Sequence, residues 1–200
     1  YAFLNQPKII KWNIARFAEC IIPFIDNDKD KAVEMATEAI NTFEEIYQNK
    51  WLNMMRDKLG LFGEDINDQI LIMDLLTWMH KNKADYTNTF CFLMNEKFSF
   101  NEKYNNEDFI IWKKRWSDRL KLNNNTEEKY LKLMHTTNPL VIPRNHMVEE
   151  ALAAANNGDI EPVHNILKVL EKPYTDQENI SIFQNPNPHG NEDYKTFCGT

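Results

Sequence analysis

The stretch KDKAVEMATEAINTFEEIYQNKWLNMMRDKL, residues 29–59, decides the fold. Its apolar residues follow one another at steps of three and four positions: Val33, Ala36, Ile40, Phe43, Tyr47, Trp51 and Met54. This spacing places them on one face of an α-helix. Gly60 stands directly after the stretch, where a glycine that caps the helix C-terminus is expected. The pattern therefore predicts one long helix that Gly60 ends.

The same periodicity extends in both directions from this helix. Before it, Pro7 is suited to a first helical turn, and a helix is predicted from there to about Phe24. Residues 26–28 then form a turn whose carboxylates can cap the long helix. After it, Asp85 is predicted to cap one helix, and helices are expected at about residues 68–81, 86–94, 109–122, 126–135, 146–155 and 162–170. We expect an all-α fold, an irregular multi-helix bundle of roughly eight helices.

The composition changes after Asp176, where Asn, Pro, Gly and His become frequent. Such a segment favours an extended chain over a packed helix. We therefore predict a helical domain over residues 1–175 and an extended tail over residues 176–200, which ends in the near-terminal Cys198. The first residue is Tyr1 rather than Met, which suggests a piece of a longer protein, although N-terminal processing could give the same start.

Composition excludes several classes of function. The 200 residues are 42% hydrophobic and 12% aromatic, which suffices for a folded core. The net charge of −7 argues against a surface that tracks nucleic-acid phosphates, so no nucleic-acid partner is expected. No apolar run reaches the roughly 18 residues of a membrane span, so no membrane partner is expected either. Three widely spaced cysteines without a CxxC motif indicate a reducing compartment, and we expect a cytoplasmic protein.

Motifs that carry chemistry are missing from the sequence. The glycines are too few and too far apart for a P-loop or a GxGxxG phosphate cradle: Gly60, Gly63, Gly158, Gly190 and Gly199. The five histidines form no HExxH motif, so no metal site is predicted. Paired acids such as Glu149-Glu150 are typical of a solvated helix face rather than of an acid–base pair. We therefore expect no catalytic residue, cofactor site or metal site in this chain, and predict that it is inactive alone.

Three features leave alternatives open. The Trp and Met residues between Trp51 and Met79 suit either a ligand pocket or, as we favour, a packed core. Residues 113–115, Lys-Lys-Arg between two tryptophans, could bind a phosphate or an acidic partner, although the exposed side of a helix with buried aromatics is favoured. Cys198 lies third from the end in a polar segment, where a reactive thiol is plausible.

Several segments, in order, carry a resemblance to a known family. They are Tyr1-Ala2-Phe3-Leu4-Asn5-Gln6-Pro7 with Trp12-Asn13-Ile14-Ala15-Arg16-Phe17-Ala18-Glu19, Asp85-Tyr86-Thr87-Asn88-Thr89-Phe90, Asn138-Pro139 with Ile142-Pro143-Arg144-Asn145-His146, Val148-Glu149-Glu150-Ala151, Gly158-Asp159, Pro173-Tyr174, and Phe197-Cys198-Gly199-Thr200. Together they resemble the C-terminal part of the selenoprotein O family of kinase-like protein adenylyltransferases. The match is weakest between residues 101 and 125.

The resemblance implies a function for the longer parent protein. Members of this family bind ATP with Mg²⁺ in a kinase-like core and transfer AMP to Ser, Thr or Tyr hydroxyls of protein substrates. The family's nucleotide-binding, metal-binding and catalytic residues all precede the segment that Tyr1 opens, so the upstream core is an implied partner. The exposed face left without that core would favour dimers of the isolated chain.

Only Cys198 matches a functional position of the family. The family places selenocysteine or cysteine there, and in bacterial members it can pair with a cysteine of the activation segment upstream. The resemblance therefore implies a redox-regulatory role for Cys198. The alternative is a stand-alone helical interaction module without catalysis, since residues 151–170 resemble part of an ankyrin unit but occur in one copy only.

Overall fold

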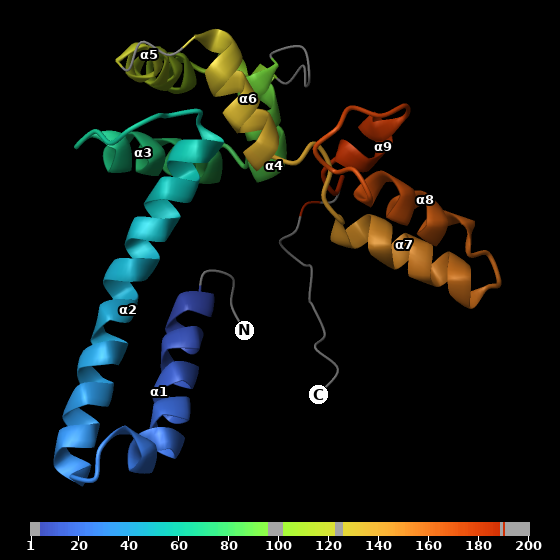
Figure 1. Cartoon of the computed structure of the whole chain (residues 1–200). Helices are drawn as coiled ribbons and strands as arrows, with labels where there is room; N and C mark the ends of the chain where they lie inside the picture. Colours follow the sequence, from blue (N-terminus) through green and yellow to red (C-terminus); the bar gives the residue numbers. More distant parts are fainter. Residues whose placement is uncertain (1–4, 96–101, 123–125, 189, 191–200) are drawn as a thin grey trace. The chain divides into compact units, whose positions relative to one another are not determined.

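The computed structural model describes residues 5–95, 102–122, 126–188 and 190 (Figure 1). These residues form α-helices joined by short connections and contain no β-strand, so the predicted all-α class is confirmed. In chain order the elements are α1 (Gln6–Ile25), α2 (Lys29–Lys58), α3 (Asp68–Lys81), α4 (Tyr86–Met94), the 3₁₀ turn η1 (Glu102–Asn105), α5 (Glu107–Lys121), α6 (Glu127–Thr137), α7 (Asn145–Asn156), α8 (Glu161–Leu170) and α9 (Ile180–Gln184).

The chain divides into two compact units, Tyr1–Met55 and Arg56–Thr200. The division falls inside α2, which is one uninterrupted helix of 30 residues. The sequence had predicted this helix as a single element, and its length follows from an apolar pattern without an internal glycine or proline.

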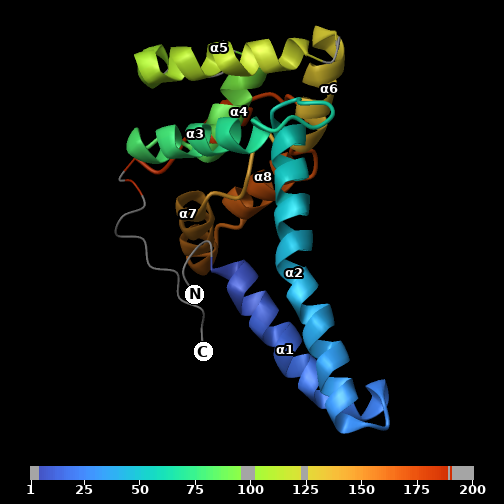
Figure 2. The same cartoon turned by 90° about the vertical axis from the view of Figure 1, so that its left-hand side faces the viewer.

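The first unit is a helical hairpin. Helix α1 and the beginning of α2 lie side by side in both Figure 1 and Figure 2. The turn between them is closed as predicted, because the Asp28 carboxylate accepts hydrogen bonds from the backbone N–H groups of Asp30 at 2.9 Å and Lys31 at 3.3 Å. The buried apolar residues of this unit are few and mostly small: Ala32, Ala36 and Met55.

The predicted apolar face of α2 is therefore only partly buried in its first half. Val33 and Tyr47 are exposed, and Ile40 and Phe43 are half-buried. Helical periodicity predicted the helix, but only part of its buried face: Val33, Tyr47 and Met54 are exposed, whereas the buried Ala32 and Met55 lie beside the predicted positions. An amphipathic helix is stabilised mainly by tertiary packing of its apolar face. In this hairpin most of that packing is missing among the described residues.

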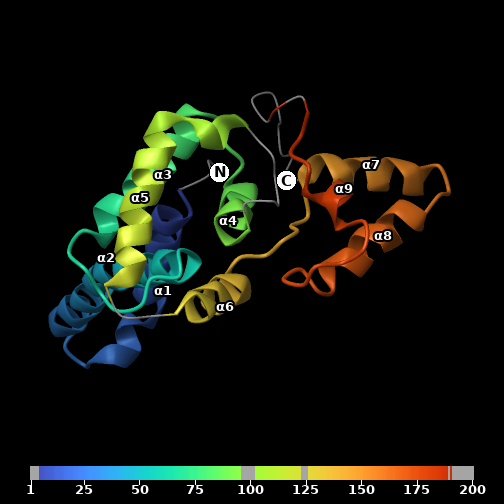
Figure 3. The same ribbon diagram turned by 90° about the horizontal axis from the view of Figure 1, so that it is seen from above.

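The second unit has a conventional core between α3 and α5, which lie alongside one another in Figure 3. The pair is antiparallel, because Asp68 at the start of α3 meets Arg119 at the end of α5, and Lys81 meets Asp108 at the other end. Large side chains from α3 to α6 fill the interior: Ile72, Leu75, Phe90, Phe109 and Met134.

The tryptophans of α5 anchor it through their polar atoms. Trp112 donates from Nε1 to the carbonyl of Leu71 at 2.8 Å, and Trp116 donates to the carbonyl of Leu59 at 2.8 Å. Both rings are buried, so each bond satisfies a donor that would otherwise be desolvated without a partner. Core packing was the favoured interpretation of the Trp and Met stripe; it holds for Met55, Trp78 and Met79, whereas Met54 and Met73 remain exposed.

A buried ionic cluster joins the end of α2 to α3 and α5. The Asp68 side chain is fully buried and accepts hydrogen bonds at 2.7 Å from Nε of both Arg56 and Arg119. Burial alone would raise the pKa of Asp68, but the hydrogen bonds from the two arginines outweigh it and hold the pKa below its usual value. Asp68 is therefore ionised at neutral pH and fixes three helices at one point.

The last part of the described chain is a second hairpin. Helices α7 and α8 pack against each other after a turn at residues 157–160, with Pro162 in the first turn of α8 as predicted (Figure 3). The segment expected to be an extended tail contains the short helix α9, whose Ile180 and Gln184 are buried. The burial of these two side chains therefore orders a region whose composition alone favours irregular structure.

Among the described residues, no helix is long and apolar enough to cross a membrane.

Gly60 provides a test of the connection between α2 and α3. Its φ is +68°, and a Cβ atom there would meet Met134 Cγ and Tyr130 Cβ of α6, each at 3.0 Å. We expect Gly60→Ala to lower the free energy of unfolding by about 1–2 kcal/mol from the left-handed conformation, and further from the contact with α6. Gly158→Ala is the matched control, because Gly158 has φ +90° but open space around it. Urea unfolding should rank Gly60→Ala as the more damaging change; equal losses would contradict the contact with α6.

Candidate functional site

Cys198, the redox candidate, lies outside the described residues. The two described thiols differ from each other in their surroundings. Cys20 is exposed on α1 and donates to the carbonyl of Arg16 at 3.4 Å, whereas Cys91 is buried in α4. The pKa of the Cys91 thiol is raised to about 12. Burial is the larger cause, and the nearby negative charge of Asp85 is the second. Cys91 is therefore protonated and unreactive at neutral pH.

The structure brings the family-like segments at residues 85–90, 138–139 and 142–146 together in one cluster. We call it the polar junction and define it by the side chains of Lys58, Asp85, Asn88, Asn138, Arg144 and Gln184. These residues come from α2, α4, α9 and the connection between α6 and α7. Segments far apart in the sequence thus meet at one place.

Asp85 occupies the centre of the polar junction. It caps α4, since its Oδ1 accepts from the backbone N–H of Asn88 at 2.8 Å. Arg144, which directly precedes α7, donates to both carboxylate oxygens of Asp85, at 2.7 and 3.0 Å. A further bond of 3.2 Å runs from Arg144 to Oδ1 of Asn88. This fork-like geometry fixes the start of α7 to the start of α4.

The amide side chains extend the polar junction toward α9. Asn88 donates to the carbonyl of Gln184 at 3.0 Å, and Gln184 donates back to the carbonyl of Leu140 at 3.0 Å. Both amide side chains belong to buried residues. The two bonds connect α4, α9 and the α6–α7 connection, and they give donors to the carbonyl of the last residue of α9 and to that of Leu140 in the connection.

Lys58 and Asn138 form the other side of the polar junction through reciprocal bonds. Lys58 Nζ donates to Asn138 Oδ1 at 2.9 Å, while Asn138 Nδ2 donates to the carbonyls of Lys58 at 2.8 Å and Met134 at 3.0 Å. The Lys58 ammonium also lies 4.6 Å from the ring centroid of Phe90. Burial lowers the pKa of Lys58 from its ordinary value.

The chemistry of the polar junction is that of a structural joint. Its arginine is occupied by a carboxylate, its lysine by an amide and an aromatic ring, and its neighbouring thiol is protonated. An acid–base or nucleophilic site requires a group that is free to exchange a proton or attack a substrate. The polar junction therefore positions helices.

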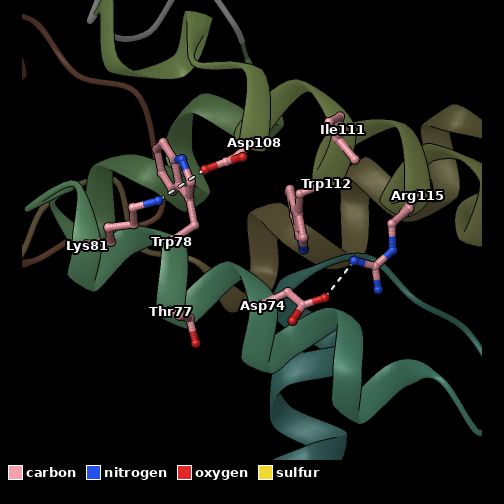
Figure 4. Close-up of a pocket in the computed structure, with 8 residues that line it drawn as sticks. All are labelled: Asp74, Thr77, Trp78, Lys81, Asp108, Ile111, Trp112 and Arg115. Carbon is pink, nitrogen blue, oxygen red and sulfur yellow. Dashed lines mark hydrogen bonds and ion pairs between the residues drawn. The ribbon is translucent and has the colours of Figure 1, made fainter.

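A shallow hollow of about 270 Å³ lies between α3 and α5 (Figure 4). Its lining residues are Asp74, Thr77, Trp78, Lys81, Asp108, Ile111, Trp112 and Arg115. Figure 4 shows an ion pair at each end, Asp74 with Arg115 at 2.6 Å and Lys81 with Asp108 at 3.4 Å. The charges that could attract a ligand are thus already neutralised by partners within the hollow.

The basic segment at residues 113–115 forms the exposed side of α5. Lys114 pairs with Asp118 at 3.4 Å, Arg115 pairs with Asp74, and the Lys113 ammonium lies 5.7 Å from the ring centroid of Phe92. Since both flanking tryptophans are buried, the structure agrees with the favoured interpretation of an exposed helix side with buried aromatics. Across the described ranges, no three His, Cys, Asp or Glu side chains are grouped so that they could hold a metal ion.

The chain matches the family described as "Protein adenylyltransferase SelO" over residues 1–171. This match covers most of the chain, which therefore belongs to the SelO family.

The curated relatives are named "Protein nucleotidyltransferase YdiU". Those of Pelagibacter ubique, Nitrosococcus oceani and Clostridium perfringens are 54%, 48% and 40% identical to this chain over 200, 201 and 200 residues. In each case the alignment covers 100% of this chain but only 41% of the relative. The chain thus spans about two fifths of the length of these relatives.

The ion pair of Arg144 with Asp85 can be tested against a matched pair on the surface. Arg144 and Asp85 retain only 8% and 22% side-chain exposure, whereas Arg115 and Asp74 retain 45% and 46% at a similar distance. We expect Arg144→Met to lower the free energy of unfolding by about 3 kcal/mol, because it leaves the Asp85 carboxylate largely buried and unpaired. Arg115→Met should cost less than about 1 kcal/mol. Urea unfolding of both variants measures this, and similar losses would show that burial does not strengthen the junction.

Proposed function

We propose that this chain is the C-terminal helical portion of a SelO-family protein adenylyltransferase and that it supports an upstream kinase-like core. The observation that carries the proposal is the family match over residues 1–171, together with relatives of which this chain spans only 41%. The name of those relatives, protein nucleotidyltransferase, supports transfer of a nucleotide by the whole protein. The acceptors we propose are the Ser, Thr or Tyr hydroxyls of protein substrates in the cytoplasm.

ATP and Mg²⁺ do not fit the described part of this chain. The cations Lys58 and Arg144 of the polar junction are engaged by protein partners, and the sequence around the positive-φ glycines, Gly60 with Gly63 and the single Gly158 and Gly190, is not that of a phosphate-binding loop. We therefore assign both ligands to the part of the parent that lies outside this chain. The role of the described helices is to hold that part in place.

Cys198 is the residue through which this chain could regulate the parent. We propose that its thiol forms a disulfide with a cysteine of the parent's activation segment. Forming that bond joins the two sulfur atoms and releases two protons and two electrons, which a low-molecular-weight disulfide such as oxidised glutathione accepts as it is reduced to two thiols. Neither of the other two cysteines is assigned this role. Cys20, which is exposed on α1, does not match the family's functional position, and Cys91 is buried and protonated.

Calorimetric titration tests the location of the nucleotide site. Mg-ATP should produce no binding heat with this 200-residue chain and saturable heat with the full-length parent. Tight binding to the chain alone would mean that a nucleotide site exists among these helices. Absence of binding to both proteins would favour a helical interaction module without catalysis.

Replacement of Cys198 separates a regulatory role from a packing role. We expect Cys198→Ser to leave the melting temperature of the chain within about 1 °C, because the polar sequence around Cys198 predicts little burial of its side chain. In the full-length parent the same substitution should abolish the difference in AMP transfer between oxidised and reduced protein. A large loss of thermal stability would identify the thiol as a packing element and overturn its redox assignment.

A further inference from the structure

Helix α1 contains no buried residue, although half of its length is apolar. Its exposed large side chains include Phe17 and Phe24, at 63% and 87% exposure. The others are Ile9, Ile10, Trp12 and Ile14. Single exposed apolar residues are common on protein surfaces, but six on one helix of 20 residues mark an interaction surface.

The exposed residues of α1 surround most of the helix. At about 100° per residue, Ile10, Ile14, Phe17 and Phe24 form one stripe with steps of four, three and seven. Trp12 lies about 200° from Ile14 and therefore on nearly the opposite side. The half-buried residues Ala15, Ala18 and Ile22 occupy a third side, and the half-buried Ile21 and Ile25 lie along or next to the stripe.

A helix with large apolar residues on opposite sides is characteristic of packing on more than one side. The side of α1 that carries Trp12 also carries Arg16, which lies 5.5 Å from the Trp12 ring centroid and pairs with Glu19 at 2.6 Å. The three aromatic side chains of α1, Trp12, Phe17 and Phe24, are all exposed, and its half-buried apolar residues are alanines and isoleucines. Helix α2, its neighbour within the first unit, contributes only Ala32, Ala36 and Met55 as buried apolar residues. A hairpin with such a small core requires a further body to cover it.

The length of the relatives identifies that body. About three fifths of each curated relative lies outside this chain, which is enough for a complete domain. A second copy of the chain would cover one side of α1 across a symmetric interface. The apolar residues on opposite sides of α1 require cover on both, which a surrounding domain provides.

We propose that residues 6–55 belong to the fold of the parent's other domain, with α1 as one of its interior helices. On this assignment α2 carries the chain out of that domain, and the separate helical domain begins near Arg56, where the second compact unit starts. The inference rests on the proposed function only in taking the parent to be a longer SelO-family protein.

Amide hydrogen exchange of the unmodified proteins tests this assignment without the risk of misfolding. Amides of residues 6–25 should exchange at least about 100-fold more slowly in the full-length parent than in the 200-residue chain. Amides of α3, which is already packed in the described structure, should exchange at similar rates in both and serve as the internal control. Equal rates for residues 6–25 would overturn the proposal.

Substitutions in the full-length parent test whether both sides of α1 are covered. Trp12→Asp and Phe17→Asp should each lower the melting temperature by about 5 °C or more. Ile66→Asp is the control, because Ile66 is 92% exposed but belongs to the second unit, and its melting temperature should change by less than about 1 °C. A neutral Trp12→Asp beside a damaging Phe17→Asp would restrict the contact to one face and overturn the interior position of α1.

Two further results separate this inference from its alternatives. If sedimentation of the 200-residue chain shows a dimer in which α1 is protected and which Phe17→Asp dissociates, a second copy covers the helix and the proposal fails. If the full-length parent binds Mg-ATP while its α1 remains unprotected, the proposed function stands and this inference fails. If α1 is protected in a parent that binds no Mg-ATP, this inference stands and the proposed function fails.

Discussion

The carboxylate of Asp68 is the constraint on which the second unit depends. It has no exposure to solvent and sits between Arg56 at the end of α2 and Arg119 at the end of α5. An ionised group in such a position is tolerated only with full pairing, and loss of one partner typically costs about 3–5 kcal/mol. The turn at Gly60, the bond from Trp116 to Leu59 and the alignment of α3 with α5 all lie next to this cluster. Its geometry therefore sets where the remaining helices can pack.

Much of the fold could be predicted from the sequence because helices leave local signals. The apolar period predicted α2 as one element, Asp85 was recognised as a cap, and Gly60 as a terminator. The ion pairs were not predictable, because Arg144 lies 59 positions from Asp85 and nothing local distinguishes it from the other arginines. Helix α9 was missed for the same reason, since Asn88 and Leu140, from distant segments, hold Gln184 at its end.

The candidate site, like the fold, could be predicted only as far as local sequence signals reach. Sequence segments that resemble the family suggested which residues matter, but not that residues 85–90, 138–139 and 142–146 meet. The carboxylate, amide and ammonium groups at the meeting point bond to one another or to backbone carbonyls, and in the described part of the chain only Nε of Arg144 is buried without a partner. Its chemistry is therefore structural. Functional groups of the parent are assigned to the part outside this chain, and Cys198 is the sole position here with a proposed regulatory task.

The uninterrupted course of α2 across the division between the two units has a thermodynamic consequence. Domains joined by a flexible linker unfold independently, because breaking the hydrogen bonds of one leaves the other intact. Here the backbone bonds around Met55 and Arg56 belong to one helix of about 45 Å, so fraying of either unit removes turns from the other. The two units are thereby coupled in cooperativity through a shared backbone, whatever side chains meet between them.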